Sequence, residues 1–129
     1  MVRSKSVLVA ASLVLGPCGL ASAHHSGAAY DEQHQQTMEG TVKSVNWTNP
    51  HITFVVEKDA KAGEPAATWV FEVSSPGVLM RSGWTKRSLQ QGDHAAFRYA
   101  PLRNGSQGGY LMKVTLPNGQ ELGYSLTPS

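Results

Sequence analysis

The residues of this sequence best suited to chemistry are its five histidines, two of which, His24 and His25, are adjacent near the N-terminus. Cleavage before His24 would give this residue a free amine beside its imidazole, and these two nitrogens can close a chelate ring around a metal ion. A third nitrogen from elsewhere completes the T-shaped site called a histidine brace. His25 is a second option, because an imidazole at position two chelates together with the preceding amide and the terminal amine. Since Cu²⁺ favours such nitrogen sites, the pattern predicts copper as the cofactor.

Three further histidines can supply the third nitrogen. His51 is the first choice, because the turn at Asn49-Pro50 would hold it rigidly at the start of a strand, as a metal ligand requires. Trp47 lies close to it in the sequence. His34, in an N-terminal arm, and His94, at the start of a later strand, are held in reserve. The simpler interpretation of each histidine is a hydrogen-bonded or solvent-exposed surface residue.

Other catalytic chemistry has little support in the sequence. The single cysteine, Cys18, lies in a leader segment, so the processed chain has no thiolate, no disulfide and no cysteine-based zinc site. Asp31, Glu32 and Glu39 lack the spacing of a paired acid and base, which favours a solvated surface. The sequence has no nucleophile elbow, Walker loop or dinucleotide fingerprint. We therefore predict no catalytic residues.

The first 23 residues have the pattern of a cleavable signal peptide. Residues 1–5 carry two positive charges, residues 6–20 are apolar or small, and residues 21–23 read Ala-Ser-Ala. The apolar stretch is shorter than the roughly 20 residues that span a bilayer, and it contains Gly and Pro. We expect cleavage before His24, a periplasmic or secreted protein, and no transmembrane segment in the mature chain.

The charge balance bears on the partners of the processed chain. The whole sequence has 11 Lys and Arg against 9 Asp and Glu, but Arg3 and Lys5 leave with the leader. The remaining chain is formally neutral. A neutral domain lacks the basic field that nucleic-acid or anionic-membrane binding usually needs. The composition therefore argues against nucleic acid and leaves a metal ion or a periplasmic protein as the expected partners.

Alternating apolar and polar residues predict a chain made mainly of strands. After an arm over residues 24–37, a barrel domain is expected over residues 38–124, followed by a tail over residues 125–129. Its first three strands are predicted at 38–47, 51–58 and 68–73. A cap-type serine before Pro76 predicts a short helix that ends at Gly83.

Two longer strands and one short strand follow the predicted helix. Ala95, Phe97 and Tyr99 share one face of a strand that begins after Gly92-Asp93, and a final short strand is expected over residues 120–124. Between them, residues 110–116 predict a strand with Tyr110, Met112, Val114 and Leu116 on one face. This order of elements predicts a small OB-like barrel of five to six strands, with one short helix between strands three and four. A plain β-sandwich is the competing architecture.

The tryptophans raise an alternative to the metal site. Trp47 and Trp84 can line a groove of the kind that OB barrels use to bind ligands, although Trp84 can equally cover one end of the barrel. Trp69 is expected to pack in the core. The basic residues of this region are best explained as a solvated surface; they are Arg81, Lys86, Arg87 and Arg103.

Several short motifs of the sequence match an uncharacterised group of exported bacterial proteins. The sequence resembles the domain of unknown function 6152 family from His24 to about Leu122, and the Trp-x-Asn-Pro-His box is the most specific of these motifs. The resemblance implies a small periplasmic or secreted β domain and supplies no catalytic role. The motifs are His24-His25-Ser26, Gly40-Thr41-Val42, Trp47-Thr48-Asn49-Pro50-His51, Ser75-Pro76, Gly83-Trp84, Gly92-Asp93, Pro101-Leu102-Arg103-Asn104-Gly105 and Gly108-Gly109.

Two functions remain open on the sequence alone. The first is a binding domain that holds copper through His24 and His51. The second is a metal-free interaction module that binds a peptide, a glycan or a partner protein against Trp47, Trp84 and the loops. An enzyme ranks third, because the sequence shows no extended substrate face.

Overall fold

The computed structural model describes residues 27–123 of the chain. The predicted leader, His24, His25 and the tail over residues 125–129 lie outside the described residues. None of the described helices is long and apolar enough to cross a membrane.

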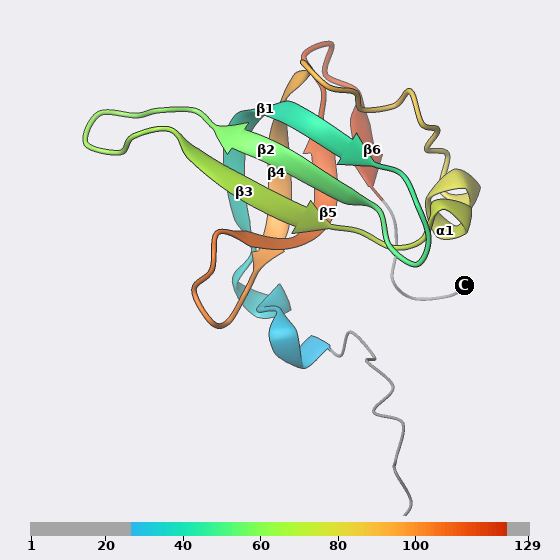
Figure 1. Ribbon diagram of the computed structural model, residues 1–129, viewed down its shortest axis with the longest axis horizontal. Helices are drawn as coiled ribbons and strands as arrows, with labels where there is room; N and C mark the ends of the chain where they lie inside the picture. The colour runs from blue at the N-terminus through green and yellow to red at the C-terminus, as the bar shows by residue number, and fades with distance from the viewer. Residues whose placement is uncertain (1–26, 124–129) are drawn as a thin grey trace, which may run out of the picture.

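Six strands and one short α-helix make up the domain (Figure 1). The strands form one sheet in the order β3-β2-β1-β4-β5-β6, and a parallel pairing between β3 and β5 closes the first five into a barrel. The elements are two 3-10 turns, η1 (Gly27–Ala29) and η2 (Glu32–His34), then β1 (Gln36–Asn46), β2 (Thr53–Lys58), β3 (Ala67–Glu72), α1 (Pro76–Arg81), β4 (His94–Pro101), β5 (Gly108–Thr115) and β6 (Glu121–Gly123). The predicted OB-like barrel, with its helix between strands three and four, is confirmed.

Aromatic side chains fill the barrel, because alternate residues of each strand point inward. Phe71 is fully buried, and its ring centroid lies 5.6 Å from that of Phe97 and 4.9 Å from that of Tyr99. Phe54 is also fully buried on β2. Burial of each such side chain contributes about 1.5–3 kcal/mol, so packing is the main source of stability in a domain whose described residues contain no cysteine.

Two β-bulges interrupt the alternation. On β5, Lys113 pairs with Arg98 and Leu111 pairs with Tyr99, so Met112 is the extra residue between them. Leu111 and Val114 are consequently both buried. The prediction that Tyr110, Met112, Val114 and Leu116 share one face of a regular strand was therefore wrong. A similar shift between Val42 and Ser44 bends β1.

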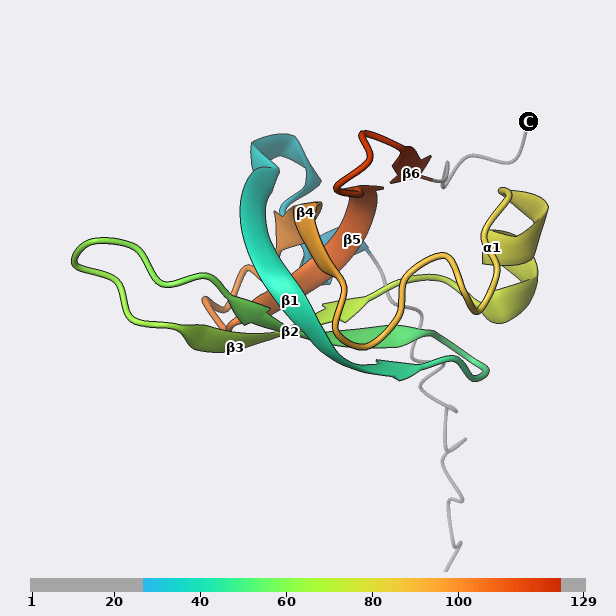
Figure 2. The same ribbon diagram turned by 90° about the horizontal axis from the view of Figure 1, so that it is seen from above.

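Helix α1 lies at one end of the barrel (Figure 2). The hydroxyl of Ser75 accepts a hydrogen bond from the amide of Val78 at 3.3 Å and so caps the helix, as the sequence predicts. Leu79 points into the core and is fully buried. The chain turns at Gly83, whose φ of 93° suits glycine, and Trp84 then re-enters the core.

The N-terminal arm lies along the connection between β4 and β5 (Figure 1). Tyr30 and Leu102 form an isolated β-bridge, and the amide of Asp31 donates to the carbonyl of Pro101 at 2.9 Å. The amide of Arg103 donates to the carbonyl of Ala29 at 3.0 Å. These backbone bonds fix the start of the described chain against the outside of the barrel.

Candidate functional site

The site centres on His51, which stands just before β2. Its neighbour Ile52 is fully buried, and the amide of Ile52 donates to the carbonyl of Ser74 at 3.1 Å. The amide of Val73 donates in turn to the carbonyl of Ile52 at 2.9 Å. These bonds extend the pairing of β2 and β3 beyond the strands themselves. They place the imidazole of His51 beside Glu72, the last residue of β3.

Glu72 lies on the outer surface of the barrel because its neighbours Phe71 and Val73 both point inward and are fully buried. Its Oε1 is 2.5 Å from the Nδ1 of His51, and the two side chains are 19% and 30% exposed. Glu72 pairs with Thr53 of β2 and with Tyr110 of β5. The carboxylate therefore sits where three strands meet, with only part of its surface in water.

Tyr30 joins this pair from the N-terminal arm. Its hydroxyl donates to Oε2 of Glu72 at 2.9 Å, and its ring centroid lies 5.4 Å from that of Tyr110. Burial raises the pKa of Tyr30 far above its ordinary value, and the hydrogen bond and negative charge of Glu72 raise it further. The phenol therefore remains a donor at any physiological pH and keeps the carboxylate in place.

The carboxylate of Glu72 orients the His51 ring through Nδ1. A neutral imidazole that donates its Nδ1 hydrogen to Glu72 carries its lone pair on Nε2. Metal-binding histidines commonly have such a carboxylate partner, which orients the ring and makes the ligating nitrogen more basic. The three side chains of Tyr30, Glu72 and His51 thus form a supported nitrogen donor, and we refer to them as the His51 triad.

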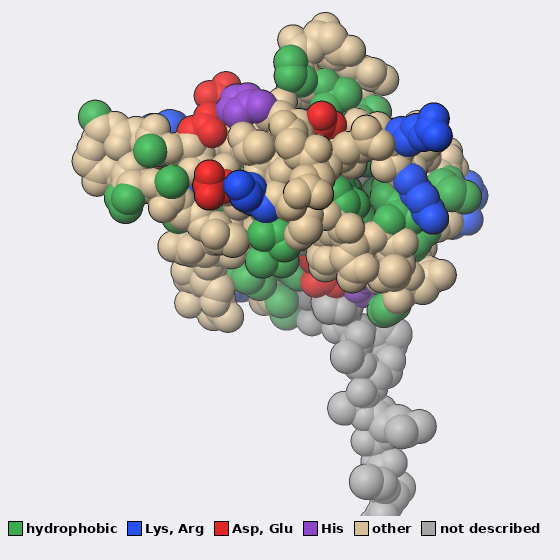
Figure 3. All heavy atoms as spheres, turned by 45° about the horizontal axis from the view of Figure 1, so that its top comes forward, with side chains coloured by type: hydrophobic (Ala, Val, Ile, Leu, Met, Phe, Trp, Pro, Cys, Tyr) green, Lys and Arg blue, Asp and Glu red, His purple; other side chains and the backbone are tan. Residues whose placement is uncertain are grey.

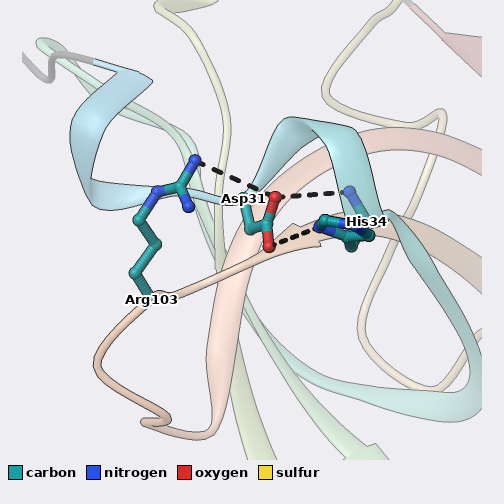
Figure 4. Close-up of polar contacts among 3 residues, drawn as sticks. All are labelled: Asp31, His34 and Arg103. Atoms are coloured by element: carbon teal, nitrogen blue, oxygen red, sulfur yellow. Dashed lines mark hydrogen bonds and ion pairs between the residues drawn. The ribbon is translucent and has the colours of Figure 1, made fainter.

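The two reserve histidines lie in other settings. His34 is on η2 with its side chain 79% exposed, and its Nδ1 is 2.9 Å from Oδ2 of Asp31 (Figure 4). His94 begins β4, and its Nε2 is 2.7 Å from Oδ2 of Asp59. Each of the three described histidines therefore has its own carboxylate. Within residues 27–123, no three His, Cys, Asp or Glu side chains form a group that could hold a metal ion.

The arm cluster around Asp31 is exposed and local. The hydrogen bond from His34 lowers the pKa of Asp31, and the charges of His34 and Arg103 lower it further against the opposing effect of burial. The guanidinium of Arg103 stands 3.8 Å from the carboxylate (Figure 4). Because η2 is capped by Asp31, this cluster holds the shape of the arm.

The predicted groove residues lie in different environments. Trp84 is only 2% exposed, its ring centroid is 6.3 Å from that of Phe54, and its indole nitrogen donates to the carbonyl of Gly123 at 3.2 Å. It therefore covers the barrel end and presents almost no surface to a ligand, which corrects its assignment to a groove. Trp47 is half-buried against the core, and so is Trp69, as expected for the latter.

Reasoning from sequence identified His51 but missed its two partners. A usable signal for Glu72 existed, because the predicted hairpin places the start of the strand at 51–58 opposite the end of the strand at 68–73. The sequence contains no comparable signal that Tyr30 lies near Glu72. Tyr30 is 42 residues from Glu72 in the chain, and only the docked arm brings the two together.

The comparisons with known proteins give a family and no activity. Residues 13–112 match the model of a family described as a family of unknown function, DUF6152. No curated protein and no solved structure matches the sequence.

Proposed function

Because the chain belongs to this family of unknown function, we propose a role from its own site: a small exported domain that binds one copper ion through His51 and the N-terminal His24. In this proposal a signal peptidase cleaves before His24, in the periplasm or during secretion. The amine and imidazole of His24 then supply two nitrogens and His51 supplies the third. His25 is the alternative partner at the N-terminus.

The observation that carries the proposal is the His51 triad. The carboxylate of Glu72 joins His51 to Tyr30 through contacts of 2.5 Å and 2.9 Å. Tyr30 follows His24 by only six residues. Six residues of fully extended chain span at most about 22 Å, and this distance is the reach that the sequence gives the proposed N-terminal ligands from Tyr30. The arm that positions the triad is therefore the same segment that carries the proposed N-terminal ligands.

The donor set favours copper over zinc. An amine and two imidazoles are nitrogen donors of the type that Cu²⁺ binds in square-planar or tetragonal geometry. Structural zinc sites more often include cysteine, and the only cysteine of this chain lies in the predicted leader. Both amine and imidazole must lose a proton before they bind, so copper affinity is expected to rise with pH.

A copper titration of two chains that differ only at the N-terminus tests the proposal. One chain begins at His24, verified by mass spectrometry, and the other carries Met-Gly-Pro before it, so that neither His24 nor His25 occupies the third position, where a histidine would form a new copper chelate with the terminal amine. We expect the extended chain to bind copper at least about tenfold more weakly, because the extension removes the amine of His24 from its chelate ring. Equal affinity of the two chains would contradict the proposal.

The same titration, repeated across pH, gives an independent check on the ligands. The ordinary pKa of a terminal amine is about 7.7–8.0, and that of an imidazole is about 6.5. Copper competes with these protons, so the affinity should increase steadily from about pH 5.5 to pH 8 and level off above the amine pKa. An affinity that does not change over this range would exclude the amine and imidazole ligands.

A metal-free interaction module is the second candidate, and one observation favours it. Val70 on β3 is 47% exposed and pairs with Val55 of β2 on the outer surface. OB barrels bind their ligands on this face. This function predicts that neither chain of the titration binds copper tightly, so the same experiment separates the two candidates.

A further inference from the structure

The region after β3 carries positive charge that no acidic residue within the region neutralises. Residues 73–92 include Arg81, Lys86 and Arg87 and contain no Asp or Glu. All three basic side chains are exposed, and no carboxylate among residues 27–123 forms an ion pair with any of them. Figure 3 shows Lys and Arg side chains gathered at the end of the molecule that carries α1, with the Asp and Glu side chains of that view lying elsewhere.

Three of the other basic residues have a carboxylate partner, among them Arg103, which lies 3.8 Å from Asp31, whereas Lys43, Lys61 and Arg98 form no ion pair among residues 27–123. Lys58 pairs with Glu64 at 3.0 Å, and Lys113 pairs with Glu121 at 2.8 Å. The neutral balance inferred from composition therefore hides a separation of charge. The α1 end has a local positive field, although the processed chain as a whole is expected to have none.

An exposed apolar side chain lies within the same segment. Met80 on α1 is 58% exposed, and Met80 and Val70 are the two large hydrophobic side chains that stand out into solvent among the described residues. Met80 directly precedes Arg81 in the chain, while its other neighbour, Leu79, is buried in the core. An exposed apolar side chain beside cations can contact an anionic lipid surface, with the apolar group at the acyl boundary and the cations at the phosphates.

We propose that the α1 end of the barrel docks on an anionic phospholipid bilayer. Arg81, Lys86 and Arg87 bind lipid phosphates, and Met80 enters the boundary between headgroups and acyl chains. Lipid fits this end better than nucleic acid does. Single-stranded nucleic acid is bound largely by stacking on exposed aromatic rings, and the aromatic residue of this segment, Trp84, is buried.

The attachment is weak and reversible by its nature. Each basic residue near an anionic surface contributes a modest attraction that is screened within a Debye length. Three cations and one methionine give partial binding to vesicles at low ionic strength and release at high salt. This binding does not require copper, so it stands or falls independently of the proposed function.

Co-sedimentation with vesicles tests the proposal. The exported, processed protein is mixed, with a chelator present, with vesicles of phosphatidylglycerol and phosphatidylcholine or of phosphatidylcholine alone. We expect binding to the anionic vesicles that is lost at about 0.5 M salt, and little binding to the neutral ones. Equal binding to both vesicles, or binding to DNA in place of vesicles, would overturn the proposal.

Substitutions locate the surface. The double variant Lys86→Gln and Arg87→Gln alters only the loop after α1, and we expect it to bind anionic vesicles about tenfold more weakly. Met80→Gln should weaken binding severalfold without any change of charge. The control is Lys61→Gln, an exposed lysine at the opposite end of the molecule, on the β2–β3 connection (Figure 1). Loss of binding in the control equal to that in the double variant would also overturn the proposal.

Discussion

Two histidines of this protein have the same kind of carboxylate partner in very different surroundings. His51 and Glu72 are 30% and 19% exposed, and Tyr30 holds the second oxygen of the carboxylate. His94 and Asp59 are 50% and 39% exposed, and among residues 27–123 no second side chain donates to Asp59.

The difference separates an oriented donor from a surface contact. Water and salt screen an exposed pair, so the pair of His94 and Asp59 contributes about 1 kcal/mol or less to the free energy of unfolding. The His51 ring is fixed by a carboxylate that is itself fixed, and such support is what metal ligands require. A histidine beside a carboxylate is therefore not sufficient to indicate a metal site. A half-buried histidine whose carboxylate is itself held by a third side chain is a better candidate.

The largest expected effect is on copper binding when each histidine is removed. In the processed chain, His51→Ala should weaken copper binding about 100-fold or more, because it removes one of the three proposed ligands. His94→Ala should change the affinity by less than about twofold. Titration of both variants under one set of conditions measures the contrast. Equal effects of the two substitutions would mean that the triad has no special role.

The next effect concerns the carboxylates. Glu72→Ala leaves His51 in place but removes its support, and the loss of such a partner typically lowers metal affinity about 10–100-fold. Asp59→Ala is the matched control, and we expect no measurable change in copper affinity. Circular dichroism establishes that both variants keep the barrel. A Glu72→Ala variant that is folded and binds copper as tightly as the parent would remove the triad from the site.

Two tyrosine substitutions extend the comparison to the stability of the fold. Tyr30→Phe removes a hydrogen bond to a charged group, worth about 1.5–3 kcal/mol, and should also weaken copper binding severalfold. Tyr99→Phe removes a bond to the amide oxygen of Gln36, worth about 0.5–1.5 kcal/mol, and should leave copper binding unchanged. Urea denaturation of the metal-free variants measures the stability difference. A larger loss for Tyr99→Phe would contradict the role assigned to Tyr30.

The smallest effect is the pH dependence of the exposed arm cluster. Because the pKa of Asp31 is lowered in the folded state, its charged form stabilises the fold. This contribution is complete above the ordinary pKa of an aspartate and disappears as the pH falls through the lowered value. The melting temperature of Asp31→Asn should therefore lie slightly below that of the parent at about pH 5 and approach it toward about pH 2. A difference that grows as the pH falls would have the wrong sign.

The fold could be predicted from local patterns because each element has a local cause. Alternation identifies the strands, and Ser75 with Pro76 marks the start of the helix, so the order of elements follows directly. The bulge at Met112 could not be predicted, because it depends on the pairing of β4 with β5. An extra residue in one strand changes which side chains face the core without altering the composition of the strand.

The candidate site was predictable in part for the same reason. The position of His51 before a strand is a local feature, and the sequence identified it. Its partners lie in β3 and in the arm, and the contact between Tyr30 and Glu72 spans 42 residues. The burial of Trp84 was similarly set by the packing of the barrel end. The residues of the predicted N-terminal site, His24 and His25, stand outside the described part of the chain.

Electron paramagnetic resonance of the copper-loaded chain that begins at His24 tests the proposed site most directly. We predict an axial Cu²⁺ spectrum with couplings to several nitrogens, altered in His51→Ala through the loss of one imidazole and unchanged in His94→Ala. Superimposable spectra of the parent and His51→Ala, or the spectrum of loosely bound copper in the parent, would show that His51 is not a copper ligand.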